Sequence, residues 1–171
     1  TVVVLGAGTV GRGAAKVALG MGADTIVLNR SLWRLGEFVD SVGMGYPGKL
    51  TALKFNQHNL EKSLKKADVV VGAILVPGTT APTLVSRDLI KEMKDDSVIV
   101  DVSIDQGGIF ETSRGTTHED PTYVEEGVVH YCVTNMPGAV PRTSTIALTN
   151  STIPYAIDLA NKGFEDAVNE D

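Results

Sequence analysis

A glycine-rich loop close to the amino terminus has residue types and spacing that could bind a phosphorylated ligand. It reads Gly6-Ala7-Gly8-Thr9-Val10-Gly11, and the apolar run Val2–Leu5 precedes it. An amphipathic segment follows, so the loop has the strand–turn–helix context of a dinucleotide-binding turn. There the first glycine allows the bend, the second lets the backbone approach a pyrophosphate, and the third lets helix and strand pack closely. Backbone N–H groups and the helix dipole then bind the phosphate charge. The alternative is a tight turn that binds nothing, and the context favours the binding function.

The end of the second predicted strand carries the residues that would meet the adenosine ribose. About twenty positions beyond the loop the sequence reads Asn29-Arg30-Ser31, and Arg34 follows. A carboxylate here would accept hydrogen bonds from the ribose hydroxyls and repel a 2′-phosphate, whereas Asn29 carries no charge. Arg30 and Arg34 offer guanidinium groups that match a phosphate. These residues therefore favour NADP over NAD; the alternative is an ordinary pair of solvent-facing arginines.

Long, irregular polar strings in the second half of the chain are more specific than the glycine loop. They lie at Ser97–Gly108, Phe110–Arg114, Thr116–His118 and His130–Ser144, with further matches at Leu148–Asn150 and Leu159–Gly163. These segments resemble the alanine dehydrogenase branch of the alanine dehydrogenase/nicotinamide nucleotide transhydrogenase family. The similarity covers essentially the whole chain.

The resemblance implies a reaction and a domain organisation. Members of the family oxidise L-alanine to pyruvate and ammonia with a nicotinamide cofactor, through hydride transfer and attack of water on the imine, and they catalyse the reverse reaction. Their second domain binds the amino acid or keto acid substrate and is built from sequence on both sides of the cofactor domain. The family's substrate-binding arginine and lysine and its catalytic histidine lie in that second domain. We therefore expect this chain alone to bind cofactor without turnover, and the full-length protein to form a homo-oligomer, a hexamer.

The resemblance also assigns individual residues. Asp105 matches the active-site aspartate beside the nicotinamide and the substrate, where it could orient water and stabilise an iminium or ammonium charge. It follows a predicted parallel strand, at whose carboxyl end such sheets bind ligands. An aspartate that caps a turn through the next N–H groups is the alternative. Further positions that match cofactor contacts are Ala73, Ile74, Leu75, Val102, Asn135 and Met136.

Two positions depart from the family pattern. Asn29 stands where the family usually has an aspartate that gives NAD preference, so the resemblance alone predicts NAD and the residues favour NADP. Phe55 replaces a small polar residue near the adenine and could stack on the ring. Both departures concern the identity of the cofactor and leave the reaction type unchanged.

Two other functions are alternatives at this point. One is the related transhydrogenase domain, which passes hydride between two nicotinamides. The other is a non-catalytic NAD(P)-sensing module that regulates a partner. The segments around Asp105 and Asn135 favour the alanine dehydrogenase branch, and the intact Asp-Gln-Gly-Gly string argues against the sensing module.

Apolar runs that alternate with amphipathic segments must position these residues. They predict βαβ units and a Rossmann-type, doubly wound α/β fold, with a mainly parallel sheet and helices on both faces. The expected strands are Val2–Leu5, Thr25–Leu28, Leu50–Phe55, Val69–Ala73, Val98–Val102 and Val128–Thr134. The expected helices are Val10–Met21, Ser31–Val42, Asn59–Lys66 with Asn59 as a cap, Ser86–Met93 with Ser86 as a cap, and Thr145–Lys162. A long polar stretch runs from Asp105 to Pro121, and we expect the acidic tail Glu165–Asp171 to fray. We divide the chain into a Rossmann domain, residues 1–141, and a helix leading toward the substrate domain, residues 142–171.

Composition excludes several classes of function. The net charge is −6 and no basic stripe is present, which argues against nucleic acid. No apolar run is long enough to span a membrane. The single cysteine, Cys132, fits a reducing, cytoplasmic location and should be a core residue. No His/Cys/carboxylate cluster has metal-ligand spacing, and His130 should be packed and hydrogen-bonded. Because Thr1 opens directly into a predicted strand, we expect a domain from a longer chain.

Overall fold

The computed structural model describes residues 1–43, 45–76, 78 and 80–170. The chain forms two compact units, Thr1–Thr134 and Asn135–Asp171. The expected boundary after residue 141 falls within the second unit, and the role of residues 142–171 as a connection to a substrate domain remains a prediction.

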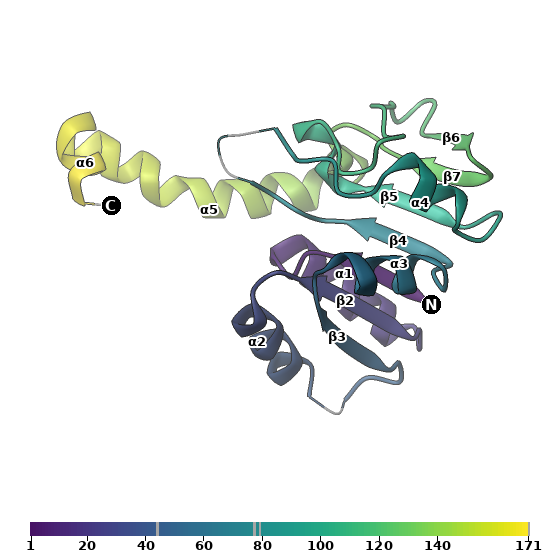
Figure 1. The fold of residues 1–171 in the computed structure, drawn as a ribbon. Helices are drawn as coiled ribbons and strands as arrows, with labels where there is room; N and C mark the ends of the chain where they lie inside the picture. Colours follow the sequence, from purple (N-terminus) through teal and green to yellow (C-terminus); the bar gives the residue numbers. More distant parts are fainter. Residues whose placement is uncertain (44, 77, 79, 171) are drawn as a thin grey trace. The chain divides into compact units, whose positions relative to one another are not determined.

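The first unit is built on one seven-stranded sheet in the order β3-β2-β1-β4-β5-β7-β6 (Figure 1). The strands are β1 Val2–Leu5, β2 Thr25–Asn29, β3 Leu50–Lys54, β4 Val69–Gly72, β5 Val98–Asp101, β6 Thr122–Glu125 and β7 Val128–Tyr131. Every neighbouring pair is parallel except β6 and β7. The strand order reverses at β1, which pairs with β2 on one side and β4 on the other. This arrangement creates the crevice at the carboxyl ends of β1 and β4 where doubly wound sheets bind ligands.

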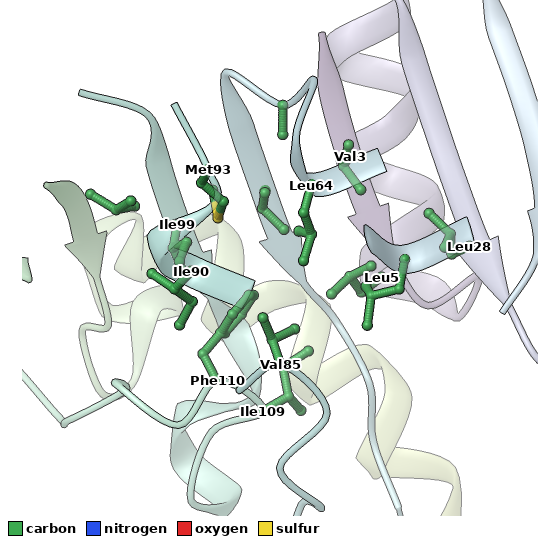
Figure 2. Close-up of a cluster of buried hydrophobic side chains, with 14 of the residues drawn as sticks. Val3, Leu5, Leu28, Leu64, Val85, Ile90, Met93, Ile99, Ile109 and Phe110 are labelled. Carbon is green, nitrogen blue, oxygen red and sulfur yellow. The ribbon is translucent and has the colours of Figure 1, made fainter. Parts of the chain in front are cut away.

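Helices cover both faces of this sheet, which confirms the predicted Rossmann-type fold. The helices are α1 Thr9–Gly20, α2 Leu32–Val42, α3 Gln57–Leu64 and α4 Arg87–Lys91. Strand β1 shows why two layers are needed, because its side chains alternate between two buried clusters. Val4 packs in the cluster that contains the buried residues of α1 and α2. Val3 and Leu5 pack in the other, with residues of α3 and α4 such as Leu64 and Ile90 (Figure 2).

The caps of two helices test the sequence predictions directly. Ser86 caps α4 as expected and accepts a hydrogen bond from the Leu89 N–H at 3.4 Å. The cap predicted at Asn59 is wrong: Asn56 caps α3 and accepts from the Asn59 N–H at 2.8 Å. The Asn59 side chain instead donates to the Lys54 carbonyl. Asparagine at either position suits a helix cap. Asn56 takes this role, and the Asn59 side chain bonds to the last residue of β3.

The segment between β5 and β7 is more ordered than its polar sequence indicates. It contains a 3₁₀ helix, η1 Val102–Gln106, and the edge strand β6, neither of which was expected. Phe110 forms a parallel bridge to Val85 and is buried together with Ile109. Strand β6 escaped prediction because none of its side chains is fully buried, so it has no apolar run.

The second unit is helical. It consists of a 3₁₀ helix, η2 Met136–Ala139, followed by α5 Pro141–Lys162 and α6 Phe164–Glu170. Helix α5 begins at Pro141 and not at Thr145, because proline suits the first position of a helix, where no N–H bond is needed. The tail expected to fray forms α6 over its described residues. In the part of the chain that is described, no helix combines the length and apolarity required to cross a membrane.

Candidate functional site

The glycine loop follows β1 and contains three glycines with different roles. Gly6 has a φ of 109°, and a methyl group on it would lie 2.4 Å from the Ala73 carbonyl oxygen. A methyl group on Gly11 would lie 1.9 Å from the Gly6 carbonyl oxygen. A methyl group on Gly8 would have no heavy atom within 4 Å. The fold therefore requires Gly6 and Gly11, whereas Gly8 leaves open space beside the backbone that a ligand can occupy.

The amino terminus of α1 has the properties of an anion site. Gly8 is its N-cap, so no side chain caps the helix, and the first turn, from Thr9 to Gly11, contains no acidic residue. The first amides of a helix have no partner within the helix, and the dipole adds positive potential there. A pyrophosphate fits this end without displacing any side-chain cap.

A pocket of about 220 Å³ lies beside this turn, at the carboxyl end of β2. It brings together six of the residues predicted to contact cofactor, namely Asn29, Arg30, Ser31, Arg34, Ile74 and Leu75. Its other lining residues are Leu28, Phe55, Val76, Pro82 and Leu84. Two arginines and no carboxylate are therefore present among the described residues that line this pocket. Its apolar wall includes the Phe55 ring, and a flat, weakly polar group such as a nucleobase suits such a wall.

Hydrogen bonds hold the polar corner of the pocket. Asn29 Oδ1 accepts from the Ala7 N–H at 3.2 Å, and Asn29 Nδ2 donates to the Ser31 carbonyl at 3.1 Å. Ser31 Oγ accepts from the Arg34 N–H at 3.3 Å and caps α2. Asn29 thus joins the glycine loop to the start of α2, while the side chains of Arg30 and Arg34 are exposed.

Asp105 lies in η1, just beyond β5, and its side chain is exposed. With Gly78, Thr80 and Gln106 it lines a second, open hollow of about 500 Å³. The Ala81 N–H donates to the Gln106 carbonyl at 2.7 Å, so the segment after β4 and the segment after β5 are bonded directly. Asp105 therefore lies at the ligand-binding edge of the sheet, and its catalytic role remains a prediction.

A buried carboxylate, Asp101, holds the segment that carries Asp105. It accepts hydrogen bonds from the N–H groups of Ser103 and Ile109, at 3.0 and 2.9 Å, and from Ser113 Oγ at 2.6 Å. Burial raises the pKa of Asp101, and the hydrogen bonds from Ser113 and the backbone oppose this rise. Sequence reasoning missed Asp101 because it ends an apolar strand. The signal in the sequence was an aspartate at the end of a strand, two residues before Ser103, because an aspartate there can accept a hydrogen bond from the N–H two residues on.

Ser103 connects the two ligand-binding strand ends. Its hydroxyl donates to the Ile74 carbonyl at 2.9 Å and accepts from the Ile74 N–H at 3.1 Å. Ile74 lines the pocket, and Ser103 lies two residues before Asp105, so one side chain fixes both segments. The predicted contacts Ala73 and Val102 instead pack against the cluster on the face covered by α1 and α2. Whether they contact cofactor remains a prediction.

His130 and Cys132 belong to the interior, as expected. His130 is fully buried: Nδ1 donates to the Val128 carbonyl at 2.9 Å, which leaves Nε2 to accept from the Thr112 hydroxyl at 2.7 Å. Its ring stacks on Tyr123, and burial lowers the pKa of His130. Burial likewise raises the pKa of the Cys132 thiol. Neither group resembles an exposed proton carrier or nucleophile.

The remaining predicted contacts, Asn135 and Met136, lie in the second unit. Asn135 has a left-handed backbone conformation, with a φ of 54°, and immediately precedes η2, which starts at Met136. Their contact with cofactor remains a prediction. Within the described ranges, no group of three or more His, Cys, Asp or Glu side chains is arranged to hold a metal ion.

Comparison with known proteins identifies the family of this chain. The sequence model of the family described as "Alanine dehydrogenase/PNT, C-terminal domain" matches residues 1–171. An alanine dehydrogenase of Staphylococcus haemolyticus is 54% identical over 165 residues, which are 96% of this chain and 43% of that protein. Alanine dehydrogenase 2 of Staphylococcus aureus is 53% identical over 97% of this chain and 44% of its own length.

Solved structures agree with the sequence comparison. An L-alanine dehydrogenase superposes with a TM-score of 0.83 and 46% identity, over 99% of this chain and 46% of that one. A transhydrogenase from Sinorhizobium meliloti has a TM-score of 0.71 and 26% identity, over 85% of this chain and 40% of that one. The chain thus spans less than half the length of these relatives. It belongs to the alanine dehydrogenase/PNT C-terminal domain family.

Proposed function

We propose that this chain is the nicotinamide-dinucleotide-binding domain of an oxidoreductase that interconverts L-alanine with pyruvate and ammonia. The observation that most supports this proposal is the geometry of the turn after β1. Close backbone contacts require glycine at positions 6 and 11, whereas Gly8 faces open space. Helix α1 starts there without a side-chain cap, so its amides can bind a pyrophosphate. The 53–54% identity to alanine dehydrogenases, against 26% to a transhydrogenase, then favours the alanine reaction among those that use such a domain.

The strand order indicates how this chain would bind the dinucleotide. The pocket at the end of β2 would hold the adenosine, with the base against Phe55 and Leu84. The residues after β4 and β5 would approach the nicotinamide, which supplies the hydride acceptor or donor when bound. Asp105 lies in this second region, where its carboxylate would orient water and stabilise positive charge on the substrate nitrogen. The amino acid and keto acid would be held mainly by a second domain of the full-length protein, which we propose is a homo-oligomer.

The corner at the end of β2 favours NADP as the cofactor. Asn29 presents an uncharged amide that is already bonded to Ala7 and Ser31, and this amide would not repel a 2′-phosphate on the ribose. Arg30 and Arg34 contribute two guanidinium groups to the same pocket and match a 2′-phosphate. Because both side chains are exposed, the benefit of each would be modest and would fall with rising salt.

Titration of this chain with NADP and with NAD tests the proposal. Binding can be followed through the sole tryptophan, Trp33, which precedes Arg34 in α2. We expect both dinucleotides to bind, NADP about ten-fold more tightly at low salt, from one added phosphate with two arginine partners. Addition of L-alanine to this chain alone should give no reduced cofactor, whereas the full-length protein should be active. Failure to bind either dinucleotide would contradict the proposal.

The variant Asn29→Asp tests the cofactor preference by itself. Aspartate keeps an oxygen for the Ala7 N–H but adds a charge that repels a 2′-phosphate and can accept from both ribose hydroxyls. We expect NADP affinity to fall about ten-fold or more while NAD affinity is maintained or improved. The matched control is Asn59→Asp, which changes the same residue type on α3, outside the pocket. Unchanged relative affinities in Asn29→Asp would show that this corner does not select the cofactor.

A further inference from the structure

Two consecutive peptide units of the glycine loop, on either side of the Ala7 Cα, are each held by a side chain. The Ala7 N–H donates to Asn29 Oδ1 at 3.2 Å, and the Ala7 carbonyl accepts from Arg12 Nε at 3.0 Å. Ala7 lies between the glycine that makes the bend and the glycine that faces open space. The orientation of the loop's amides is therefore fixed by contacts that lie outside the loop.

Arg12 connects the Ala7 carbonyl with α2. Its Nη2 donates to the Arg34 carbonyl at 3.1 Å and to Glu37 Oε2 at 2.9 Å. An isolated surface ion pair contributes little. Here, however, two of the three acceptors are backbone carbonyls, and the rigid guanidinium fork reaches both elements. Arg12 thus connects the loop that would bind the pyrophosphate with the helix that carries Arg34.

The pairing with Glu37 has a second consequence. Glu37 lies three residues after Arg34 on α2, a spacing at which a carboxylate and a guanidinium can pair. While Glu37 is bonded to Arg12, its charge is neutralised and does not compete for Arg34. Without Arg12, the carboxylate would pair with Arg34 or face an incoming phosphate unscreened.

We propose that Arg12 is a positioning residue that makes the glycine loop and the cationic corner a single preorganised surface. It orients the Ala7–Gly8 peptide through the Ala7 carbonyl, anchors the first turn of α2, and keeps Arg34 available for a 2′-phosphate by engaging Glu37. The proposal rests on the proposed dinucleotide-binding function. It predicts that Arg12 affects both cofactors through the loop, and NADP additionally through Glu37. Binding surfaces that are ordered before the ligand arrives gain affinity in this way.

Three variants separate the effect of Arg12 on the glycine loop from its effect on NADP binding through Glu37. In Arg12→Gln we expect NAD affinity to fall about three-fold and NADP affinity about ten-fold or more, since only NADP meets the unpaired Glu37. In the double variant Arg12→Gln/Glu37→Gln the NADP-to-NAD ratio should return to its original value, although both affinities stay lowered. Lys16→Gln removes a positive charge one turn further along α1 and is the matched control. The Lys16 side chain makes no hydrogen bond or ion pair with any described residue.

Backbone hydrogen exchange of the ligand-free chain gives a readout that does not depend on binding. In Arg12→Gln the amides from Ala7 to Val10 should exchange faster, while those of β1 and β4 keep their protection, which also shows that the variant folds. Arg12→Lys, which retains the charge without the fork, should give an intermediate exchange rate. If the wild-type chain binds no dinucleotide, the proposed function fails. The exchange rates of the ligand-free chain would then still show whether Arg12 orders the loop. Unchanged loop exchange in Arg12→Gln, or an NADP-to-NAD ratio equal to that of the wild type, would overturn this inference.

Discussion

The two halves of the ligand-binding edge are built by different means. The glycine-loop side, residues 1–43, positions its groups through close backbone approach and through exposed side chains such as Arg30 and Arg34. The Asp105 side, residues 97–134, depends on side chains that are wholly or largely buried, including Asp101 and His130. Their partners come from positions 2 to 18 residues away.

This difference separates the determinants of binding from those of stability. Exposed charges interact weakly in water, so replacing them should change ligand affinity more than the free energy of unfolding. A buried polar group that loses its partner keeps its desolvation cost, so replacing it should destabilise the fold.

Gly11→Ala should give the largest loss of stability. It would show that close backbone contacts on the glycine-loop side, unlike its exposed charges, contribute to the free energy of unfolding. The added methyl group would lie 1.9 Å from a backbone oxygen that has no flexible end to move away. We expect a loss of about 3 kcal/mol in the free energy of unfolding, measured by urea denaturation, together with weakened dinucleotide binding. Gly13→Ala is the control, two residues further along α1, where the new methyl group meets no heavy atom within 4 Å. It should stabilise the chain by about 0.5–1 kcal/mol, because alanine favours helix. Equal effects of the two substitutions would refute the steric argument.

Asp101→Asn should produce the next largest loss. In the native protein the carboxylate accepts hydrogen bonds from the Ile109 N–H and the Ser113 hydroxyl. The NH₂ group of asparagine is itself a donor, so it would face one of these donors without forming a bond. We expect destabilisation of about 2 kcal/mol from unsatisfied buried donors. Asp105→Asn, at an exposed position in the same segment, should change stability by less than about 1 kcal/mol while lowering turnover of the full-length protein. A comparable stability loss in both variants would remove the distinction between a positioning and a reacting aspartate.

His130 should make stability depend on pH. Burial lowers its pKa in the folded chain, so the unfolded chain takes up the proton first as the pH falls below about 6.5. The free energy of unfolding is therefore fully retained above that pH. It should decrease toward lower pH by up to about 1.4 kcal/mol per unit until the lowered pKa is passed. In His130→Asn this dependence should disappear, whereas His58→Asn, at an exposed position, should retain it. Urea denaturation between pH 7.5 and 5.5 measures the difference, and an unchanged slope in His130→Asn would assign the effect to other groups.

The glycine-loop side could be predicted largely from the sequence, because its contacts are local and its elements are strongly patterned. The alternation of apolar runs with amphipathic segments predicted the Rossmann fold, and the residues after β2 were predicted to meet at one corner. The structure brings Asn29, Arg30, Ser31 and Arg34 around one pocket, as that prediction requires. The role of Arg12 was missed, since its partners Arg34 and Glu37 lie on another helix.

The Asp105 side shows what only the tertiary structure decided. A polar string from Asp105 to Pro121 has no periodicity, yet it supplies partners to buried polar groups: Ser113, which is half-buried, bonds to Asp101, and buried Thr112 bonds to His130. Edge strand β6 pairs with β7; its residues Thr122, Tyr123 and Val124 favour β structure, but they form no apolar run that marks a strand in the sequence. The sequence by itself determined the buried strands, the glycine turn and the residue types at the strand ends, because each depends on neighbours along the chain. The tertiary structure decided which buried polar groups hold Asp105, because desolvation and hydrogen bonding depend on partners that only folding brings together.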